Sequence, residues 1–135
     1  MFNRLYEPDI DIRNMKISSS EVFSSPEDLR QSLRWISLVS DPHRAIDISG
    51  STGIHDSAAA IKVLLAGAKT TQVCSVLYKK GPEYLKEIIS GISTWMEEKG
   101  YQSVDEFRGS MSYRSFGDPR TWERSQFMRY YSNRH

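Results

Sequence analysis

The sequence predicts a mixed α/β fold in which a helix connects two parallel strands. Three adjacent segments support this prediction: a β-branched run over 44–49, an alanine-rich helical pattern over 56–66 and a β-rich run over 70–75. A strand, turn, helix, strand order requires parallel strands and a right-handed crossover. We therefore expect 44–49 and 70–75 to be neighbours in one sheet.

Residues typical of helix ends mark the boundaries of the central helix. Asp56 is a candidate N-cap, because its carboxylate can accept the free N–H groups of the first turn. Gly67 follows the last apolar residues and is expected to close the helix. The other expected elements are helices over 26–39, 82–99 and 119–131, a short helix over 103–109, a loop over 7–14 and a turn over 79–82.

Length and composition favour one partial domain. The chain has 135 residues, with a hairpin or loop expected over 15–25 and a C-terminal extension over 111–135. The apolar fraction of 39% is somewhat low for a self-contained domain, which favours a part of something larger. A net charge of +1 provides no field that would attract nucleic acid or an anionic membrane.

The single cysteine and the absence of a long apolar run indicate a cytoplasmic protein. Cys74 has no partner in the chain for an intramolecular disulfide, which suits a reducing compartment. No apolar run approaches the ~18 residues that a membrane span needs. Candidate metal ligands are scattered, and we identify no catalytic residue and no metal site in this sequence.

Small residues follow both predicted strands, at Ser51-Thr52-Gly53 and at Cys74-Ser75. Parallel neighbours end at the same edge of a sheet, and small residues there let backbone N–H groups approach a phosphate. These five residues are therefore candidate cofactor-binding residues. The alternative is an ordinary turn, in which glycine only eases a tight bend.

Two side chains near these loops, Cys74 and His55, could have a direct role in catalysis or ligand binding. Cys74 is a potential nucleophile, but the sequence places no base or cation beside it, so a small semi-buried residue is the preferred interpretation. His55 follows the glycine turn and is expected to be exposed there rather than to face a ligand. Lys79 and Lys80 are expected in a solvated turn.

Several segments in series resemble the carboxyl-terminal part of class 1 dihydroorotate dehydrogenases. The resemblance extends over roughly 44–110. It rests on five segments: Ser51 to Asp56, Leu64 to Ala68, Gln72 to Pro82, Trp95 to Tyr101 and Ser103 to Gly109.

The resemblance implies a TIM (β/α)8 barrel that binds flavin mononucleotide (FMN), of which this chain would be the last two or three βα units. In that family a Gly-Gly turn after the seventh strand holds the flavin phosphate, and Thr52-Gly53 occupies its place. Two small residues after the eighth strand contact the same phosphate, and Cys74 and Ser75 match them. An Asn at the end of the sixth strand contacts substrate and corresponds to Asn3.

Two departures from the family pattern limit what the resemblance implies. Arg4 replaces a residue that is often Ser, which affects orotate-type specificity. The family's amino-terminal half, which carries the active-site base, has no counterpart in these 135 residues. The expectation is therefore an incomplete barrel that supplies the phosphate end of the FMN site in an enzyme of pyrimidine biosynthesis, acting on a dihydroorotate-like substrate.

The partners expected of such a part are the missing barrel half or a second copy, because an incomplete barrel has free sheet edges. A second hypothesis stays open: a non-catalytic α/β module that acts by self-association or by docking on another chain. A third is another barrel enzyme with a phosphate-bearing substrate.

Overall fold

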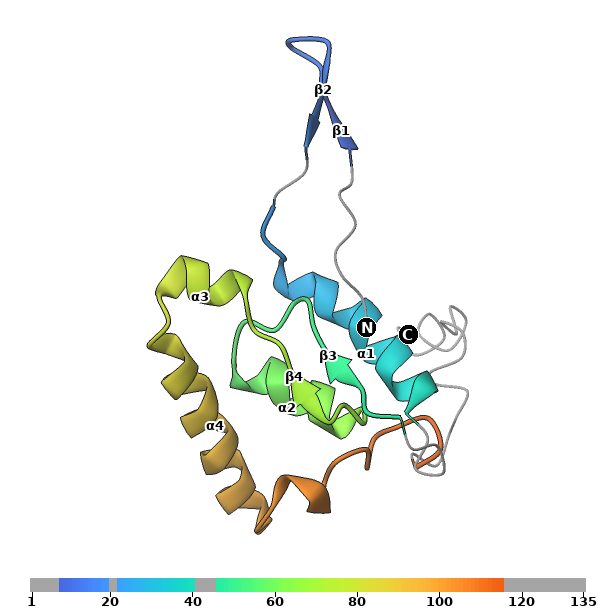
Figure 1. Cartoon of the computed structure of the whole chain (residues 1–135), viewed down its shortest axis with the longest axis vertical. Helices are drawn as coiled ribbons and strands as arrows, with labels where there is room; N and C mark the ends of the chain where they lie inside the picture. The colour runs from blue at the N-terminus through green and yellow to red at the C-terminus, as the bar shows by residue number, and fades with distance from the viewer. Residues whose placement is uncertain (1–7, 20–21, 41–45, 116–135) are drawn as a thin grey trace, which may run out of the picture.

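The computed structural model describes residues 8–19, 22–40 and 46–115, as a mixed α/β body with a hairpin standing away from it (Figure 1). In chain order the elements are β1 (Pro8–Asp11), β2 (Lys16–Ser19), η1 (Pro26–Asp28), α1 (Leu29–Val39), β3 (Ser49–Gly50), α2 (Ser57–Leu65), β4 (Thr70–Thr71), α3 (Ser75–Lys80), α4 (Tyr84–Lys99) and η2 (Val104–Glu106).

The predicted parallel pair is confirmed, although its strands are shorter than expected. β3 and β4 are parallel neighbours, with Ser49 opposite Thr70 and Gly50 opposite Thr71. The Gln72 N–H donates to the Gly50 carbonyl at 2.7 Å, which continues the pairing beyond β4. Only two sheets of two strands each occur in the described residues, and these strands form no closed barrel.

The central helix begins and ends where the sequence predicts. The Asp56 carboxylate accepts the Ala59 N–H at 2.7 Å, as an N-cap does. At the other end Gly67 has a φ of 112°, a conformation that glycine adopts without strain. The carbonyls of Leu64 and Leu65, in the last turn of α2, accept N–H groups from residues 109 and 111. The segment after η2 therefore caps α2.

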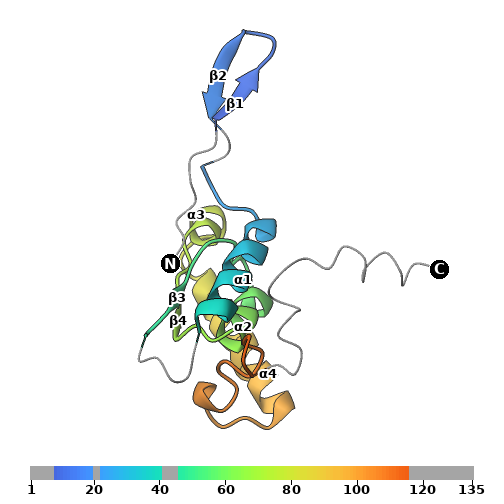
Figure 2. The same ribbon diagram turned by 90° about the vertical axis from the view of Figure 1, so that its right-hand side faces the viewer.

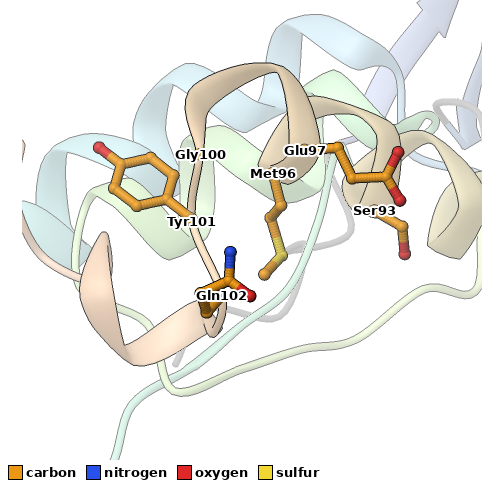
Figure 3. A pocket seen from close by; sticks show the side chains of 6 residues that line it. All are labelled: Ser93, Met96, Glu97, Gly100, Tyr101 and Gln102. Atoms are coloured by element: carbon orange, nitrogen blue, oxygen red, sulfur yellow. The ribbon is translucent and has the colours of Figure 1, made fainter.

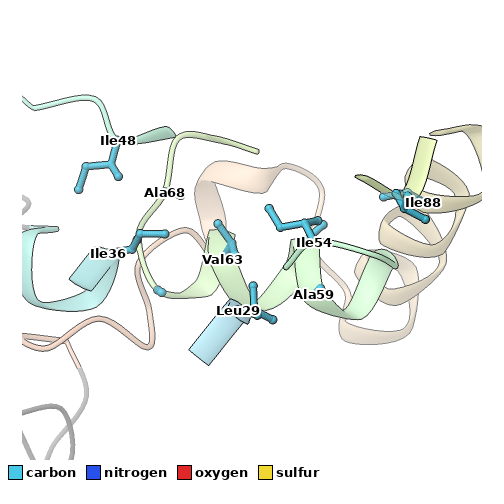
Figure 4. Packing of buried hydrophobic residues seen from close by; sticks show 11 residues of the cluster. Leu29, Ile36, Ile48, Ile54, Ala59, Val63, Ala68 and Ile88 are labelled. Atoms are coloured by element: carbon cyan, nitrogen blue, oxygen red, sulfur yellow. The ribbon is translucent and has the colours of Figure 1, made fainter. Parts of the chain in front are cut away.

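The core gathers side chains from α1, α2 and the segment that leads into β3, and Val76 of α3 and Ile88 of α4 extend it (Figure 4). At Gly50 the helices approach the sheet closely, because an added Cβ would collide with Val63 of α2 and lie 3.1 Å from Ile36 of α1. Val63 and Ile36 are both almost fully buried. A glycine without positive φ is therefore required at Gly50 for packing, not for backbone conformation.

The helix expected over 26–39 begins as the 3-10 turn η1 and continues as α1. The Asp28 carboxylate accepts the Ser25 N–H at 2.8 Å at this start. The buried face of α1 differs from a simple apolar stripe, because Ser32 and Ser37 are buried while Trp35 is 40% exposed. Ser32 donates to the Ser51 carbonyl, so this small side chain lets the helix lie close to the loop after β3, which the hydrophobic pattern alone does not reveal.

Residues 75–80 form helix α3, so the prediction of a strand end followed by a turn is wrong for this segment. The Cys74 carbonyl accepts the N–H groups of Leu77 and Tyr78 at 2.9 and 3.2 Å, which starts the helix. Val76 is 1% exposed and packs into the core. Burial of Val76 in a helical turn overrides the β-propensity of this segment.

Helix α4 matches the predicted span within two residues, and Gly100 ends it with a left-handed φ of 76°. Ile88 is buried and Ile92 packs on the core, but Leu85 and Ile89 are 41% and 55% exposed. The predicted core stripe is thus only partly covered. The short helix expected near 103–109 is the 3-10 turn η2.

The hairpin is formed by β1 and β2, earlier in the chain than the 15–25 expected, and the loop expected over 7–14 contains strand β1 and part of the turn that follows it. Figure 2 shows the hairpin standing clear of the helices. At its tip, the Asp11 carboxylate accepts hydrogen bonds from the Asn14 side chain and from the N–H groups of Asn14 and Arg13, which lower the pKa of that carboxyl.

Several sequence-based predictions lie outside the described residues. These are the substrate residue Asn3, the neighbouring Arg4, the helix break at Asp41 and Pro42, the helix over 119–131 and most of the 111–135 extension. In the described part of the chain, no helix has the length and apolar character needed to cross a membrane.

Substituting Gly50 tests the close packing of α2 on β3. We expect Gly50→Ala to lower the free energy of unfolding by about 1–3 kcal/mol, because the new methyl overlaps Val63. Val63→Ala frees that space, so the double variant should lose less stability than the two single changes together. Urea unfolding followed by circular dichroism measures all three. Additive losses would show that Gly50 and Val63 do not compete for one space.

Candidate functional site

The loops that follow β3 and β4 lie at the same edge of the sheet, because the two strands are parallel and in register. The first loop carries Ser51, Thr52 and Gly53. The second carries Cys74 and leads directly into Ser75 of α3. The five predicted cofactor-binding residues are therefore brought to one edge of the fold, while their role in binding remains a prediction.

The first loop turns through two consecutive left-handed residues, Thr52 with a φ of 74° and Gly53 with a φ of 77°. This conformation is strained for a β-branched residue such as threonine and easy for glycine. Thr52 therefore adopts a glycine-like backbone, which agrees with its place opposite a glycine in the resemblance described above.

Gly53 is fixed by packing as well as by conformation. A Cβ at this position would collide with the backbone N of Leu29 and lie 2.8 Å from its Cα, at the start of α1. The loop is also tied to α1 by the buried Ser32, whose hydroxyl donates to the Ser51 carbonyl at 2.8 Å. Helix α1 therefore holds the shape of this loop.

A polar cluster joins three segments at the same edge; we call it the Ser24–His55–Ser75 cluster. The Ser24 hydroxyl lies 3.1 Å from His55 Nε2 and 3.0 Å from the Ser75 hydroxyl, and the Ser24 N–H donates to the Ser75 hydroxyl at 3.0 Å. Ser24 is 8% exposed and the other two are half-buried. His55 is therefore not the exposed turn residue that the sequence suggested.

Ser24 is a member of this site that the sequence did not predict. It lies 51 residues before Ser75 in the chain. No local pattern distinguishes it from the other serines around the hairpin, and only the tertiary structure brings it to the strand ends.

Two other predictions about side chains need correction. The Cys74 thiol is exposed rather than semi-buried. Lys79 and Lys80 are exposed, as predicted, but they lie in the last turn of α3 rather than in a turn. Their ammonium groups lie 5.8 Å from the centroid of the Phe23 ring and 3.9 Å from that of the Tyr84 ring. The hydrogen bond with Tyr84 raises the pKa of Lys80.

The composition of this edge suits an anion. Its candidate residues offer hydroxyl groups, a thiol and backbone N–H groups, and none of the five is a carboxylate. The nearest carboxylate in sequence, Asp56, is engaged with the Ala59 N–H. A phosphate group such as that of FMN fits these donors chemically.

The described residues offer no metal site away from this edge. They contain no group of three or more His, Cys, Asp or Glu side chains that could hold a metal. A shallow pocket of about 400 Å³ lies at the C-terminal end of α4, far from α3 (Figures 1 and 3). Its lining residues are Ser93, Met96, Glu97, Gly100, Tyr101 and Gln102.

Comparison with known proteins gives a partial match to dihydroorotate dehydrogenases. No protein-family model matches the chain. Over 70 residues, 52% of the chain, it is 37% identical to a protein of Streptococcus pyogenes serotype M3 named dihydroorotate dehydrogenase A (fumarate). Proteins of the same name from Streptococcus equi subsp. equi and Streptococcus agalactiae serotype V are 36% and 35% identical over 70 and 69 residues.

The match covers 22% of the length of each of these relatives. About half of this chain therefore resembles about a fifth of a dihydroorotate dehydrogenase A. The match confirms the resemblance stated from the sequence.

The strained threonine can be tested with one substitution at two positions. We expect Thr52→Gly to raise the free energy of unfolding by about 1 kcal/mol, because glycine accepts the left-handed conformation. The matched control, Thr70→Gly in β4, should lower it by about 1 kcal/mol, because glycine weakens a strand. Thermal and urea unfolding measure the change in the free energy of unfolding for both variants. A loss at Thr52 equal to that at Thr70 would contradict a strained loop.

Proposed function

We propose that this chain supplies the phosphate end of the flavin site in an FMN-dependent oxidoreductase that resembles dihydroorotate dehydrogenase. The observation that carries the proposal is the edge where two small-residue loops meet. That edge lies in a chain of which about half matches dihydroorotate dehydrogenase A. Either observation alone is weaker, because small strand-end loops also occur as ordinary turns.

In this proposal the FMN phosphate lies between the two loops. The backbone N–H groups of Thr52, Gly53, Cys74 and Ser75 would hold it, with Ser51 at the start of the first loop. Bound FMN supplies the hydride chemistry that side chains do not provide. The contribution of this chain is to hold the phosphate and thereby to orient the flavin.

The substrate end of the reaction belongs to other segments. The proposed reaction of the intact enzyme is the oxidation of dihydroorotate, or of a related molecule, to an orotate-type product. Asn3 is the proposed substrate contact, and the catalytic base lies in barrel units that these 135 residues do not contain. A complete barrel needs about 250 residues. The missing units come from another segment or from a partner chain.

Discrimination between FMN and riboflavin tests the proposal, because the two differ only by the phosphate. We expect the purified chain to bind FMN at least about tenfold more tightly than riboflavin, as measured by flavin fluorescence. Cys74→Glu should abolish that preference, because it places a carboxylate beside the phosphate. The exposed Gln72→Glu, two residues earlier, is the matched charge control and should keep it.

Equal binding of FMN and riboflavin, or equal effects of the two Glu substitutions, would refute the phosphate assignment. Gly53 is unsuitable for this test, since any side chain there collides with Leu29 whether or not a ligand is bound.

A separate prediction concerns turnover. The chain supplied with FMN, dihydroorotate and an artificial electron acceptor should oxidise dihydroorotate no faster than FMN alone, because catalysis needs a positioned base and a flavin shielded from water. Absorbance of orotate formed over time is the measurement. A rate above the FMN control would place the catalytic base within these residues.

The hairpin favours a second candidate function, a module that acts by association. Ile10 and Ile17 are directly opposite each other across the hairpin, and with Ile12 and Met15 they are between 68% and 85% exposed. An isolated two-stranded hairpin is marginally stable in water and needs a surface to pack against. Association with the missing barrel half or with a second copy would cover these side chains.

Sedimentation at micromolar concentration tests this candidate. We expect wild-type chain to associate, either with itself or with an added amino-terminal barrel half, and Ile10→Ser/Ile17→Ser to weaken that association. The control variant, Asp9→Ser/Ser18→Asp, changes the opposite face of the same strands. This candidate would be refuted if the chain sediments as a monomer with either pair of substitutions, without them, and in the presence of the added barrel half.

A further inference from the structure

The Ser24–His55–Ser75 cluster leaves the hydroxyl proton of Ser75 with two possible directions. One hydrogen bond in the cluster has a fixed direction: the Ser24 backbone N–H donates to the Ser75 oxygen at 3.0 Å. The contacts of the Ser24 hydroxyl with Ser75 at 3.0 Å and with His55 Nε2 at 3.1 Å depend on where the protons lie.

Two proton arrangements satisfy these distances. In the first, His55 Nε2–H donates to Ser24 and the Ser24 hydroxyl donates to Ser75. The Ser75 proton then points out of the cluster, since its oxygen already accepts two hydrogen bonds. In the second, Ser75 donates to Ser24 and Ser24 donates to an unprotonated Nε2. The Ser75 proton is then used inside the cluster.

We propose that His55, acting through Ser24, orients the Ser75 hydroxyl so that a proton on Nε2 turns Ser75 outward as a donor to a bound phosphate monoester. His55 and Ser24 are positioning residues in this relay, and Ser75 is the group that contacts the ligand. The inference rests on the phosphate site proposed above and adds its regulation by proton binding.

A bound phosphate favours the first arrangement, because its oxygens accept hydrogen bonds and only this arrangement points the Ser75 proton out of the cluster. A hydroxyl donor to an anion forms a charge-assisted hydrogen bond, which is about twice as strong as a neutral one. Binding and proton position are therefore linked in both directions: a proton on Nε2 strengthens phosphate binding, and bound phosphate strengthens retention of that proton.

Ser75 is free to act outward in the described part of the chain. Its hydroxyl is half-buried, and within residues 8–19, 22–40 and 46–115 its only side-chain hydrogen bonds are those to Ser24. Ser24 itself is 8% exposed, so its hydroxyl depends on Ser75 and His55 for its hydrogen bonds. The buried serine transmits the orientation without contacting the ligand.

The charged side chains on the surrounding elements have contacts with groups other than the Ser24 and Ser75 hydroxyls. Asp28 of η1 accepts the Ser25 N–H, and Asp56 accepts the Ala59 N–H. In α3, Lys79 and Lys80 lie over aromatic rings, and the exposed Cys74 thiol precedes Ser75. His55 Nε2 lies 3.1 Å from the Ser24 hydroxyl, so His55 is the ionisable group in direct contact with the relay.

The sign of the pH dependence follows from the relay. Histidine is the side chain that changes charge between pH 5 and 8, and the protonated ring always carries a proton on Nε2. Protonation of the His55 ring therefore favours the outward Ser75 proton and should raise the affinity for phosphate. Phosphate also titrates in this range, so the comparison must be between variants at each pH.

Binding of inorganic phosphate and FMN to the full 135-residue chain, measured from pH 5.5 to 8, tests the relay. His55→Gln keeps an amide N–H donor near the Nε2 position and loses the titration. We expect its affinity to change with pH about fivefold less than that of the wild type. Ser24→Ala breaks the relay and should weaken binding at pH 6. Its matched control is Ser112→Ala, which removes a buried serine hydrogen-bonded to Ser115 far along the chain.

Nitrogen-15 NMR of the histidine rings gives a readout that does not depend on affinity. With His55→Gln used to assign the signal, added phosphate should shift His55 towards the form protonated on Nε2. If phosphate and FMN bind but the pH dependence is equal in wild type and His55→Gln, or Ser24→Ala behaves like Ser112→Ala, the relay is overturned and the phosphate site stands. If neither ligand binds any variant, the phosphate site itself falls and the relay with it.

Discussion

The close approach of helix α2 to strand β3 is the constraint on which the rest of this structure depends. Gly50 has no side chain, so Val63 of α2 and Ile36 of α1 reach the backbone of the strand. Because the strands are only two residues long, they contribute few hydrogen bonds of their own. Packing of the two helices against this one position therefore holds the parallel pair together and fixes the direction in which both loops leave the sheet.

Packing against α1 also determines the shape of the loop that follows β3. Leu29 at the start of α1 leaves room only for a glycine at position 53, and Ser32 in the next turn fixes the Ser51 carbonyl. The edge formed in this way is built from backbone and small polar groups. In the proposed site, an anion would be bound through directed hydrogen bonds rather than through net charge, and the overall charge of the chain is only +1.

The surfaces of the molecule are consistent with a role as part of a larger assembly. The helices cover the Gly50 face of the short sheet, whereas Thr70, on the opposite face, is exposed. The hairpin carries isoleucines that nothing in the described structure covers. A barrel would provide neighbours for the sheet, and a partner surface would provide them for the hairpin. Both features follow naturally if the match to a fifth of a larger enzyme reflects common architecture.

The sequence by itself determined the local elements whose signals are local. Asp56 and Gly67 delimit α2, and Gly100 ends α4, because caps act through the backbone within one turn. The strand, helix, strand order also determined the parallel pairing, and the two small-residue loops followed from it. The tertiary structure alone decided that 75–80 is helical, since burial of Val76 outweighs β-propensity. It also decided that Ser24 meets His55 and Ser75, because contacts across 31 and 51 residues leave no trace in local patterns.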